Sequence, residues 1–331
     1  MKPINKFLLD NDLRIADNPC VSPDFCLDWE GLQADLVSGA DLTHHGKSRV
    51  STSHGEWTLV ENRSGDHAWC LEPADPETEG MDELLENGFR QNDEFFFPAG
   101  YENLIRIKNL FQEADSDCSI FPTAGADLGR STLGVGARFT TLHWDGVDWA
   151  MSRLGKGLTA NQNSIPRELV YDVDEMLADR LDSVPFPFIG TDVPEGHQGQ
   201  SVEGMSHGCI LAKLKSGFHS RKIQWSFNAD HQPIGGKFDV REDQLVAGCL
   251  FASYITFDIS PELALTVVPE SVEAKAAYVS ANVPVDLVSA ARRRVEEAGL
   301  SPTDDEFNGL LAYVWPAMQK MKVRDDKYRA A

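Results

Sequence analysis

A carboxylate and an imidazole stand side by side in this sequence, at Asp230 and His231, where the stretch Lys222–Asp230 ends. This stretch is predicted to form a buried strand. Polar groups at the carboxyl end of such a strand point into the mouth of the sheet, where α/β enzymes keep their active sites. A carboxylate beside an imidazole can bind a divalent metal or move a proton. The alternative is a loop in which both side chains only cap the following helix.

A single arginine, Arg138, follows a glycine-containing strand and could grip a carboxylate or phosphate with two guanidinium nitrogens. A surface salt bridge explains it equally well. The segment from Gly125 to Thr132 is not a phosphate loop, because its glycine spacing is too short and Arg130 stands where a lysine is needed. It is not a dinucleotide fingerprint either, since Gly134-Val135-Gly136 lacks the third glycine.

Amide side chains form another candidate, in Asn161-Gln162-Asn163 at the end of a second predicted strand. Amides at that position can hydrogen-bond the hydroxyl groups of a sugar, and Gln162 is the preferred contact. The competing interpretation is local, because Ser164 is a good N-cap for a helix that begins near Pro166.

Two further patterns are not taken as sites. The letters Gly204-Met205-Ser206-His207-Gly208 match the nucleophile elbow of serine hydrolases. That motif needs a buried strand before the serine, whereas the residues preceding it here are polar and rich in glycine. The histidines His44, His45 and His54 lie in a weakly patterned region and are predicted to be solvated.

Strands that alternate with helices must position these residues. The second part of the chain is predicted to be an α/β region that builds either an open doubly wound sheet or a TIM-barrel-like (β/α)8 fold. Its four units make only half a barrel, whose outer strands expose backbone groups that a homodimer could cover. The predicted strands are 133–142, 158–163, 222–230 and 253–259; the predicted helices are 145–154, 166–181, 207–214, 240–252, 269–281, 285–298 and 304–321, with a long loop over 182–206.

The first part of the chain is predicted to hold a smaller α/β unit. Residues 1–55 are weakly patterned and are expected to be an irregular arm. These patterns divide the chain into an N-terminal region, 1–120, and a partial (β/α) barrel with C-terminal helices, 121–331. In the first region strands are predicted at 56–60, 67–71 and 94–97, and helices at 80–89 and 101–114.

Composition narrows the functional classes. The 331 residues include 52 acidic and 30 basic ones, a net charge of −22 that disfavours binding to nucleic acid and to anionic membrane surfaces. The longest nearly apolar run, 245–257, is too short to cross a bilayer, and the first residues do not resemble a signal peptide. Six cysteines without a CxxC pair indicate reduced thiols and a cytoplasmic protein.

Three blocks of the sequence together resemble the tagaturonate epimerase family, over residues 90–320. Each block is short, and what is specific is that they keep their order and spacing. The first runs from Phe95-Phe96-Phe97 and Glu102-Asn103-Leu104 to Ser131-x-x-Gly134-x-Gly136-x-Arg138, the second passes through Gln162, and the third joins Asn228-Ala229-Asp230-His231 to Asp243-Gln244-Leu245-Val246 and Ile255-Thr256-Phe257-Asp258.

This resemblance implies a barrel-like fold and a metal-dependent epimerase that removes a proton beside the ketone of a keto-hexuronate, a small sugar acid. It also implies a divalent metal ion, with His231 as a ligand. Asp230 would be the catalytic base, and Arg138, Gln162 and Asn228 would bind the substrate.

The sequence departs from the family pattern in two places and in length. Ala137 and Asn228 stand where acids are expected. Family members are longer, so the second half of their barrel has no counterpart after residue 321. We therefore expect a fragment, a protein completed by a second chain, or one that has lost the chemistry. Two other functions stay open: a metal-dependent sugar isomerase or aldolase, and a non-catalytic half-barrel that binds carbohydrate or a partner.

Overall fold

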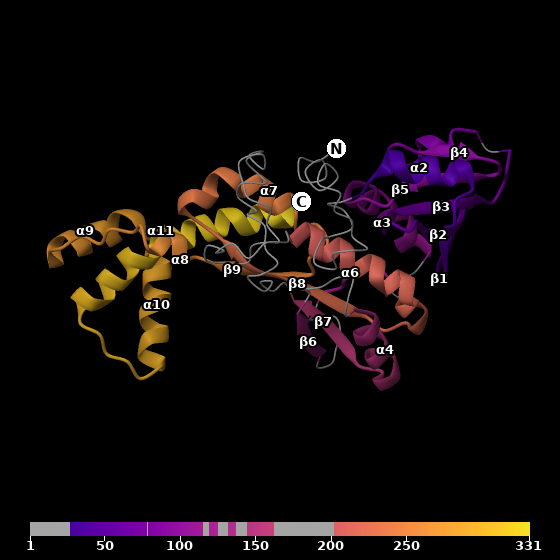
Figure 1. Ribbon diagram of the computed structural model, residues 1–331. Helices are drawn as coiled ribbons and strands as arrows, with labels where there is room; N and C mark the ends of the chain where they lie inside the picture. The colour runs from indigo at the N-terminus through magenta and orange to yellow at the C-terminus, as the bar shows by residue number, and fades with distance from the viewer. Residues whose placement is uncertain (1–26, 78, 115–118, 125–131, 137–143, 162–201) are drawn as a thin grey trace, which may run out of the picture. The chain divides into compact units, whose positions relative to one another are not determined.

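The structure is a computed structural model that describes residues 27–331 except 78, 115–118, 125–131, 137–143 and 162–201. The chain forms two compact units. One consists of the residues up to Asp230 together with 248–255, and the other of 231–247 together with 256–331. The secondary structure is mixed α/β, with a five-stranded antiparallel sheet and a four-stranded parallel sheet (Figure 1).

An asparagine fixes the hairpin at the centre of the antiparallel sheet. The side-chain oxygen of Asn62 accepts hydrogen bonds from the backbone N–H groups of Ser64 and Asp66, at 3.0 and 2.9 Å. This turn brings Glu61 directly opposite His67 on the next strand. The strands lie in the order β1-β2-β3-β5-β4, with β1 at Thr43–Thr52, β2 at Gly55–Glu61, β3 at His67–Pro73, β4 at Phe89–Gln91 and β5 at Glu94–Pro98.

Both faces of this sheet are apolar, and each packs against a helix. On one face Leu32 and Leu36 of helix α2 join the core of the sheet. On the other face Phe111 of helix α3 meets Trp57 and Trp69 edge to face, with ring centroids 5.9 and 5.5 Å apart. The two helices are α2, Trp29–Ser38, and α3, Tyr101–Ala114.

The parallel sheet has the strand order β6-β7-β8-β9, and hydroxyl groups cross its interior. Thr159 Oγ1 lies 2.7 Å from Thr132 Oγ1 and 2.8 Å from Ser226 Oγ. These groups satisfy one another where water is absent, and the strand register places Asn161 opposite Asn228. The elements are β6 at Thr132–Gly136, α4 at Trp144–Leu154, β7 at Gly157–Asn161, α6 at Val202–Ser216, η5 at Phe218–Arg221, β8 at Trp225–Pro233 and β9 at Tyr254–Asp258.

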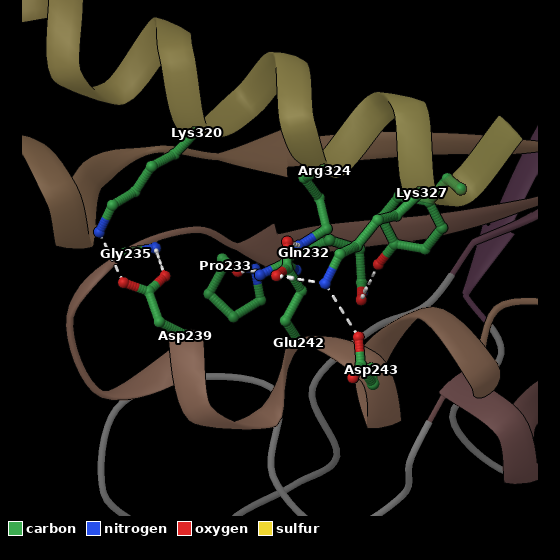
Figure 2. A network of polar contacts seen from close by, with 10 residues as sticks. Gln232, Pro233, Gly235, Asp239, Glu242, Asp243, Lys320, Arg324 and Lys327 are labelled. Atoms are coloured by element: carbon green, nitrogen blue, oxygen red, sulfur yellow. Dashed lines mark hydrogen bonds and ion pairs between the residues drawn. The ribbon is translucent and has the colours of Figure 1, made fainter. Parts of the chain in front are cut away.

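The second unit is mainly helical, and a buried arginine anchors its longest helix, α11. Arg324 is 1% exposed and donates to Glu242 Oε1 at 2.7 Å and to the carbonyl of Pro233 at 3.3 Å (Figure 2). Lys327 donates to the second oxygen of Glu242 at 2.8 Å. Buried charge is tolerated only when it is paired, so this network fixes α11 against α7. The helices are η6 at Gly236–Arg241, α7 at Glu242–Ala247, α8 at Ser260–Leu263, α9 at Val272–Asn282, α10 at Val285–Glu297 and α11 at Asp304–Ala330.

Most predicted elements coincide with observed ones. Periodicity located β2, β3, β5, β7, β8 and β9 among the strands, and α3, α4, α9 and α10 among the helices, within a few residues. The alternation of strands and helices that predicted parallel pairing is confirmed for β6 with β7 and for β7 with β8. The predicted helix at 166–181 lies outside the described residues.

Four of the expectations were wrong. The end of the expected irregular arm forms α2 and β1, and the predicted helix at 80–89 is a short 3-10 turn, η1 at Met81–Glu83, followed by β4. Of the predicted helix at 240–252, only residues 242–247 are α-helical, as the short α7. Helix α11 continues to Ala330 rather than ending near Met321. In β1 and in the end of α11 polar residues dominate, so hydrophobic periodicity gives no signal there.

The described cysteines Cys70, Cys209 and Cys249 are free, buried thiols, as predicted for reduced cysteines. Burial raises the pKa of Cys70 and of Cys209, which makes both thiols unreactive. In the part of the chain that the structure describes, no helix combines the length and the apolar character needed to cross a membrane.

Candidate functional sites

Amide and carboxylate side chains meet where Asn161, the last residue of β7, lies opposite the middle of β8. Asn228 Nδ2 donates to Asn161 Oδ1 at 2.6 Å, and Asn161 Nδ2 donates to Asp230 Oδ2 at 3.3 Å. They meet because Asn161 pairs with Asn228, and because Asn228 and Asp230 are two residues apart on the same face of β8. The structure thus brings together two predicted site residues, Asn228 and Asp230, and adds Asn161.

A tyrosine next to this cluster supplies a hydroxyl group. Burial raises the pKa of Tyr254, and the negative charge of Asp230 raises it further. The phenol is therefore neutral at physiological pH and can donate a hydrogen bond. One carboxylate that can accept a proton, flanked by amides and a phenol, is suited to a ligand with hydroxyl and carbonyl oxygens.

The other predicted site residues are not seen in this cluster. Arg138 and Gln162 lie outside the described residues. His231 lies on β8 with a backbone φ of 48°, in the left-handed region that few residues other than glycine adopt. Among the described residues His231 belongs to no group of three possible metal ligands. Its role as a ligand stays a prediction.

A different trio of possible metal ligands lies on the antiparallel sheet, formed by His45 of β1, Glu61 of β2 and His67 of β3. Glu61 Oε2 lies 2.7 Å from His45 Nε2 and 3.3 Å from His67 Nε2. One ligand atom from each of the three residues lies within 4.8 Å of the other two. The residues meet because Glu61 pairs with His67, while His45 pairs with Leu59, two positions from Glu61 on the same face.

The pairing of β1 becomes irregular just after His45. The register between β1 and β2 shifts between His45 and Val50. Ser48 bridges the irregular stretch, because its hydroxyl donates to the carbonyl of His45 at 2.7 Å and accepts from the N–H of Leu59 at 2.8 Å. The prediction that His45 is solvated is therefore wrong, since the side chain is partly buried and bonded to Glu61.

A lysine from α6 completes the cluster. Lys215 Nζ lies 2.9 Å from Glu61 Oε2 and 3.0 Å from His67 Nε2. An ammonium group can only donate hydrogen bonds. Donation from Lys215 to His67 Nε2 requires the tautomer with the ring proton on Nδ1, a buried nitrogen that has no hydrogen-bond partner among the described residues. A carboxylate oxygen and an imidazole lone pair converge on a single cationic atom.

Burial and neighbouring charges set the protonation of this cluster. Burial lowers the pKa of His67 to about 4, helped by the Lys215 charge, so the imidazole is neutral at neutral pH. Burial alone would raise the pKa of Glu61. Hydrogen bonds from His45 and His67, together with the charges of His67 and Lys215, outweigh that effect and hold the pKa of Glu61 well below its usual range. The cluster therefore presents one carboxylate and a neutral imidazole to the ammonium.

The cluster opens onto a pocket of about 380 Å³. His45 and Lys215 line this pocket together with Lys47 and Arg221, which form no ion pair with any described residue. Trp149, which is 66% exposed, contributes an aromatic surface. In a chain as acidic as this one, a pocket lined by Lys47, Lys215 and Arg221 favours an anionic molecule.

The nucleophile-elbow letters do not form a site. Ser206 lies within α6 and is fully buried, not at a sharp turn after a strand. Residues 202–206 are helical, so the prediction of a loop is wrong for these residues, and the rest of the predicted loop lies outside the described residues. His207 Nε2 lies 2.7 Å from the carbonyl oxygen of Ala99, which identifies it as a buried structural histidine.

The sequence contained a partial signal for the trio on the antiparallel sheet. Glu61 and His67 flank the predicted turn of a hairpin and share a face with buried tryptophans, so polar groups on that face needed partners. His45 and Lys215 could not be found in this way, because β1 has no alternating pattern and α6 is distant in the chain.

Comparison with solved structures finds distant matches. The structure is similar to the native crystal structure of fructuronate-tagaturonate epimerase UxaE from Cohnella laeviribosi, with a TM-score of 0.43 and 12% identity. The match covers 90% of this chain and 52% of that one, so the chain spans about half the length of the enzyme it matches. A complex of the same enzyme with two glycerols matches with a TM-score of 0.43 and 13% identity, over 91% of this chain and 53% of that one.

Similarity at this level describes the chain trace and assigns no activity or residue role. No protein-family model matches the sequence, and no curated protein sequence matches it significantly.

Proposed function

We propose that the chain acts on sugar acids as a keto-hexuronate epimerase does, with Asp230 as the base that removes a proton beside the ketone. The observation that supports this proposal is the hydrogen-bonded series Asn228–Asn161–Asp230, which joins the carboxyl end of β7 to the parallel strand β8. A general base works when neighbours hold it within reach of the proton that it takes. The amide of Asn161 would hold the Asp230 carboxylate in this way.

The remaining roles in this proposal come from the family resemblance. Arg138 would bind the carboxylate of the sugar acid, and Gln162 and Asn228 its oxygens. The sheet β6–β9 would be half of a (β/α)8 barrel, completed by a second copy of the chain or by further chain. A bound divalent ion would polarise the ketone. His231 is the proposed ligand, although it belongs to no group of three possible metal ligands among the described residues.

Exchange of the proton beside the ketone tests the proposal. Tagaturonate and fructuronate are incubated with the protein and a divalent metal in D2O, and the loss of that proton is followed by NMR. We expect the wild-type protein to catalyse exchange and Asp230→Asn to slow it at least about 100-fold, the usual contribution of a general base. Asp93→Asn removes the same charge at an exposed position and leaves the rate unchanged.

The outcomes separate the alternatives. Exchange with inversion supports an epimerase, whereas exchange without inversion favours an isomerase or an incomplete site. If the wild-type protein catalyses no exchange, the enzymatic proposal fails. Binding of the sugar acid without exchange, measured by calorimetry, would then favour a carbohydrate-binding protein.

A further inference from the structure

The cluster around Lys215 has the donor groups of a metal site and already holds a positive charge. We propose that His45, Glu61 and His67 form a divalent-metal site of the kind that takes Zn²⁺, in which the Lys215 ammonium occupies the place of the ion. This site lies on the antiparallel sheet and shares no residue with the proposed Asp230 centre, so it goes beyond the function proposed above.

The donor set suits zinc. Two imidazole nitrogens and one carboxylate oxygen form a ligand set found in catalytic zinc sites, which keep a fourth position for water or another ligand. Bonds of about 2.0–2.2 Å at tetrahedral angles leave ligand atoms roughly 3.3 Å apart. Glu61 Oε2 lies 2.7 and 3.3 Å from the two Nε2 atoms, so small side-chain rotations complete the geometry.

The protonation of these groups also suits a metal. The lone pair of His67 Nε2 and an oxygen of Glu61 both face Lys215 Nζ, at 3.0 and 2.9 Å. A cation there accepts the same lone pairs that a metal accepts. Because His45 lines the pocket, an ion has a path from solvent to the cluster.

Lys215 is the obstacle to metal binding, and it is a movable one. Its side chain is 26% exposed and lines the pocket, where the exposed Asp145 can receive it. The flexible four-carbon stem of lysine allows that movement. Metal binding at the trio therefore competes with an internal cation, and removing this cation strengthens the binding. If the cluster were only an ion pair that holds α6 on the sheet, removing Lys215 would not create affinity for a metal.

Calorimetric titration with Zn²⁺ and visible absorption with Co²⁺, on protein without an affinity tag, test the proposal. We expect Lys215→Met to bind Zn²⁺ at least about tenfold more tightly than the wild type, because a positive charge in contact with the ion is removed. In the Lys215→Met background, His45→Ala should abolish this binding. His44→Ala is the matched control, because His44 pairs with Val60 and points to the opposite face.

The variants are chosen so that failure to fold cannot imitate loss of the site. His67 is almost fully buried, so its replacement risks the fold, whereas His45 is partly exposed. Thermal unfolding of each variant checks that the fold persists. The proposal is overturned if Lys215→Met binds no Zn²⁺ or binds it no more tightly than the wild type, or if His45→Ala leaves the binding intact. Asp230→Asn and His231→Ala should not change the affinity for Zn²⁺. The tests of this site and of the proposed epimerase centre are therefore independent.

Discussion

Two lysines, Lys213 and Lys215, lie two residues apart on α6. The ammonium group of one is fully buried, whereas that of the other is partly exposed to solvent. Lys213 is fully buried, and its ammonium pairs with Asp148 of α4. Lys215 is partly exposed and faces Glu61 and His67 at the rim of a pocket. The Lys213 ammonium also lies over three aromatic rings, those of Trp144 at 4.7 Å, Phe218 at 4.3 Å and Trp225 at 4.8 Å.

This difference in burial indicates which of the two ammonium groups another cation can replace. Removing the Lys213 ammonium would leave the Asp148 carboxylate, which is 1% exposed, without its cation, and this costs several kcal/mol. The region around Lys213 is therefore structural. Around Lys215 the pocket admits water, so another cation can replace the ammonium at little cost. The same residue type thus serves packing at one position and belongs to the proposed metal site at the other.

The largest effect is expected from Asp148→Ala, which leaves the Lys213 ammonium buried without a carboxylate. We expect the free energy of unfolding to fall by about 3–5 kcal/mol, the usual result of breaking a buried ion pair by removing one partner. Urea unfolding followed by circular dichroism measures it. Lys215→Met is the control and should cost less than about 1 kcal/mol, as for a partly exposed pair.

A double variant sharpens this test. Adding Lys213→Met to Asp148→Ala removes the orphaned charge and supplies an apolar side chain to the aromatic rings, so it should restore part of the lost stability. If the double variant is less stable than Asp148→Ala alone, the contacts of the ammonium with the rings matter more than its pairing with Asp148.

Hydrophobic periodicity predicted the elements that bury one clear face. It located α3, whose residues Leu104, Ile107 and Phe111 are buried at helical spacing, and the central strands of both sheets. It failed on β1, whose sequence is almost entirely polar and whose strand nature comes from pairing with β2. The strand conformation of β1 is determined by its pairing with β2, which no local sequence pattern indicates.

The candidate sites also divide into residues that a local pattern places together and residues that only tertiary pairing places together. Asn228 and Asp230 could be predicted as neighbours, because residues two apart at a strand end share a face. The trio of His45, Glu61 and His67 needed the register of three strands and a bulge, which a single sequence does not reveal. Lys215 needed in addition the packing of α6 on the sheet.

Glu242→Gln tests an intermediate case, a buried cation with a partly exposed partner. Arg324 is as buried as Asp148, but its carboxylate partner Glu242 is reached by solvent. We expect this variant to lose about 2 kcal/mol of unfolding free energy at pH 7, less than Asp148→Ala, because water can partly replace the lost carboxylate. Urea unfolding measures it, and a loss as large as that of Asp148→Ala would contradict this ranking.

The stability difference between wild type and Glu242→Gln is expected to depend on pH. Burial would raise the pKa of Glu242, but hydrogen bonds from Lys327 and Arg324 outweigh it and lower the pKa below the ordinary value of 4.5. Stability from a lowered carboxylate pKa is fully present above the unfolded-state value and is lost as pH falls through the folded-state value. The stability gap between wild type and Glu242→Gln should therefore narrow below pH 4.5. A gap that stays constant down to pH 2.5 would contradict the pairing.

A smaller effect on stability is expected at the irregular stretch of β1 that follows His45. Ser48→Ala leaves the N–H of Leu59 and the carbonyl of His45 without their buried partner, which costs about 1–2 kcal/mol. It should also weaken Zn²⁺ binding in the Lys215→Met background, because His45 is no longer held in line with Glu61. Ser38→Ala, at an exposed hydroxyl that ends α2, is the control for both measurements. Unchanged Zn²⁺ affinity in a destabilised Ser48→Ala protein would show that the trio does not depend on the bulge.

The smallest effect distinguishes direct contact with the metal ligands from longer-range electrostatic repulsion in the region around Lys215. Lys47 lines the same pocket as His45 but forms no bond with the trio in the described structure. Lys47→Met should therefore raise the affinity for Zn²⁺ only about two- to threefold, and 0.5 M salt should erase that gain because the Debye length shrinks to a few ångströms. The gain from Lys215→Met should survive the same salt, since the ammonium is in contact with the ligand atoms. Equal gains from the two variants would mean that Lys215 acts only through its charge and does not occupy the place of the ion.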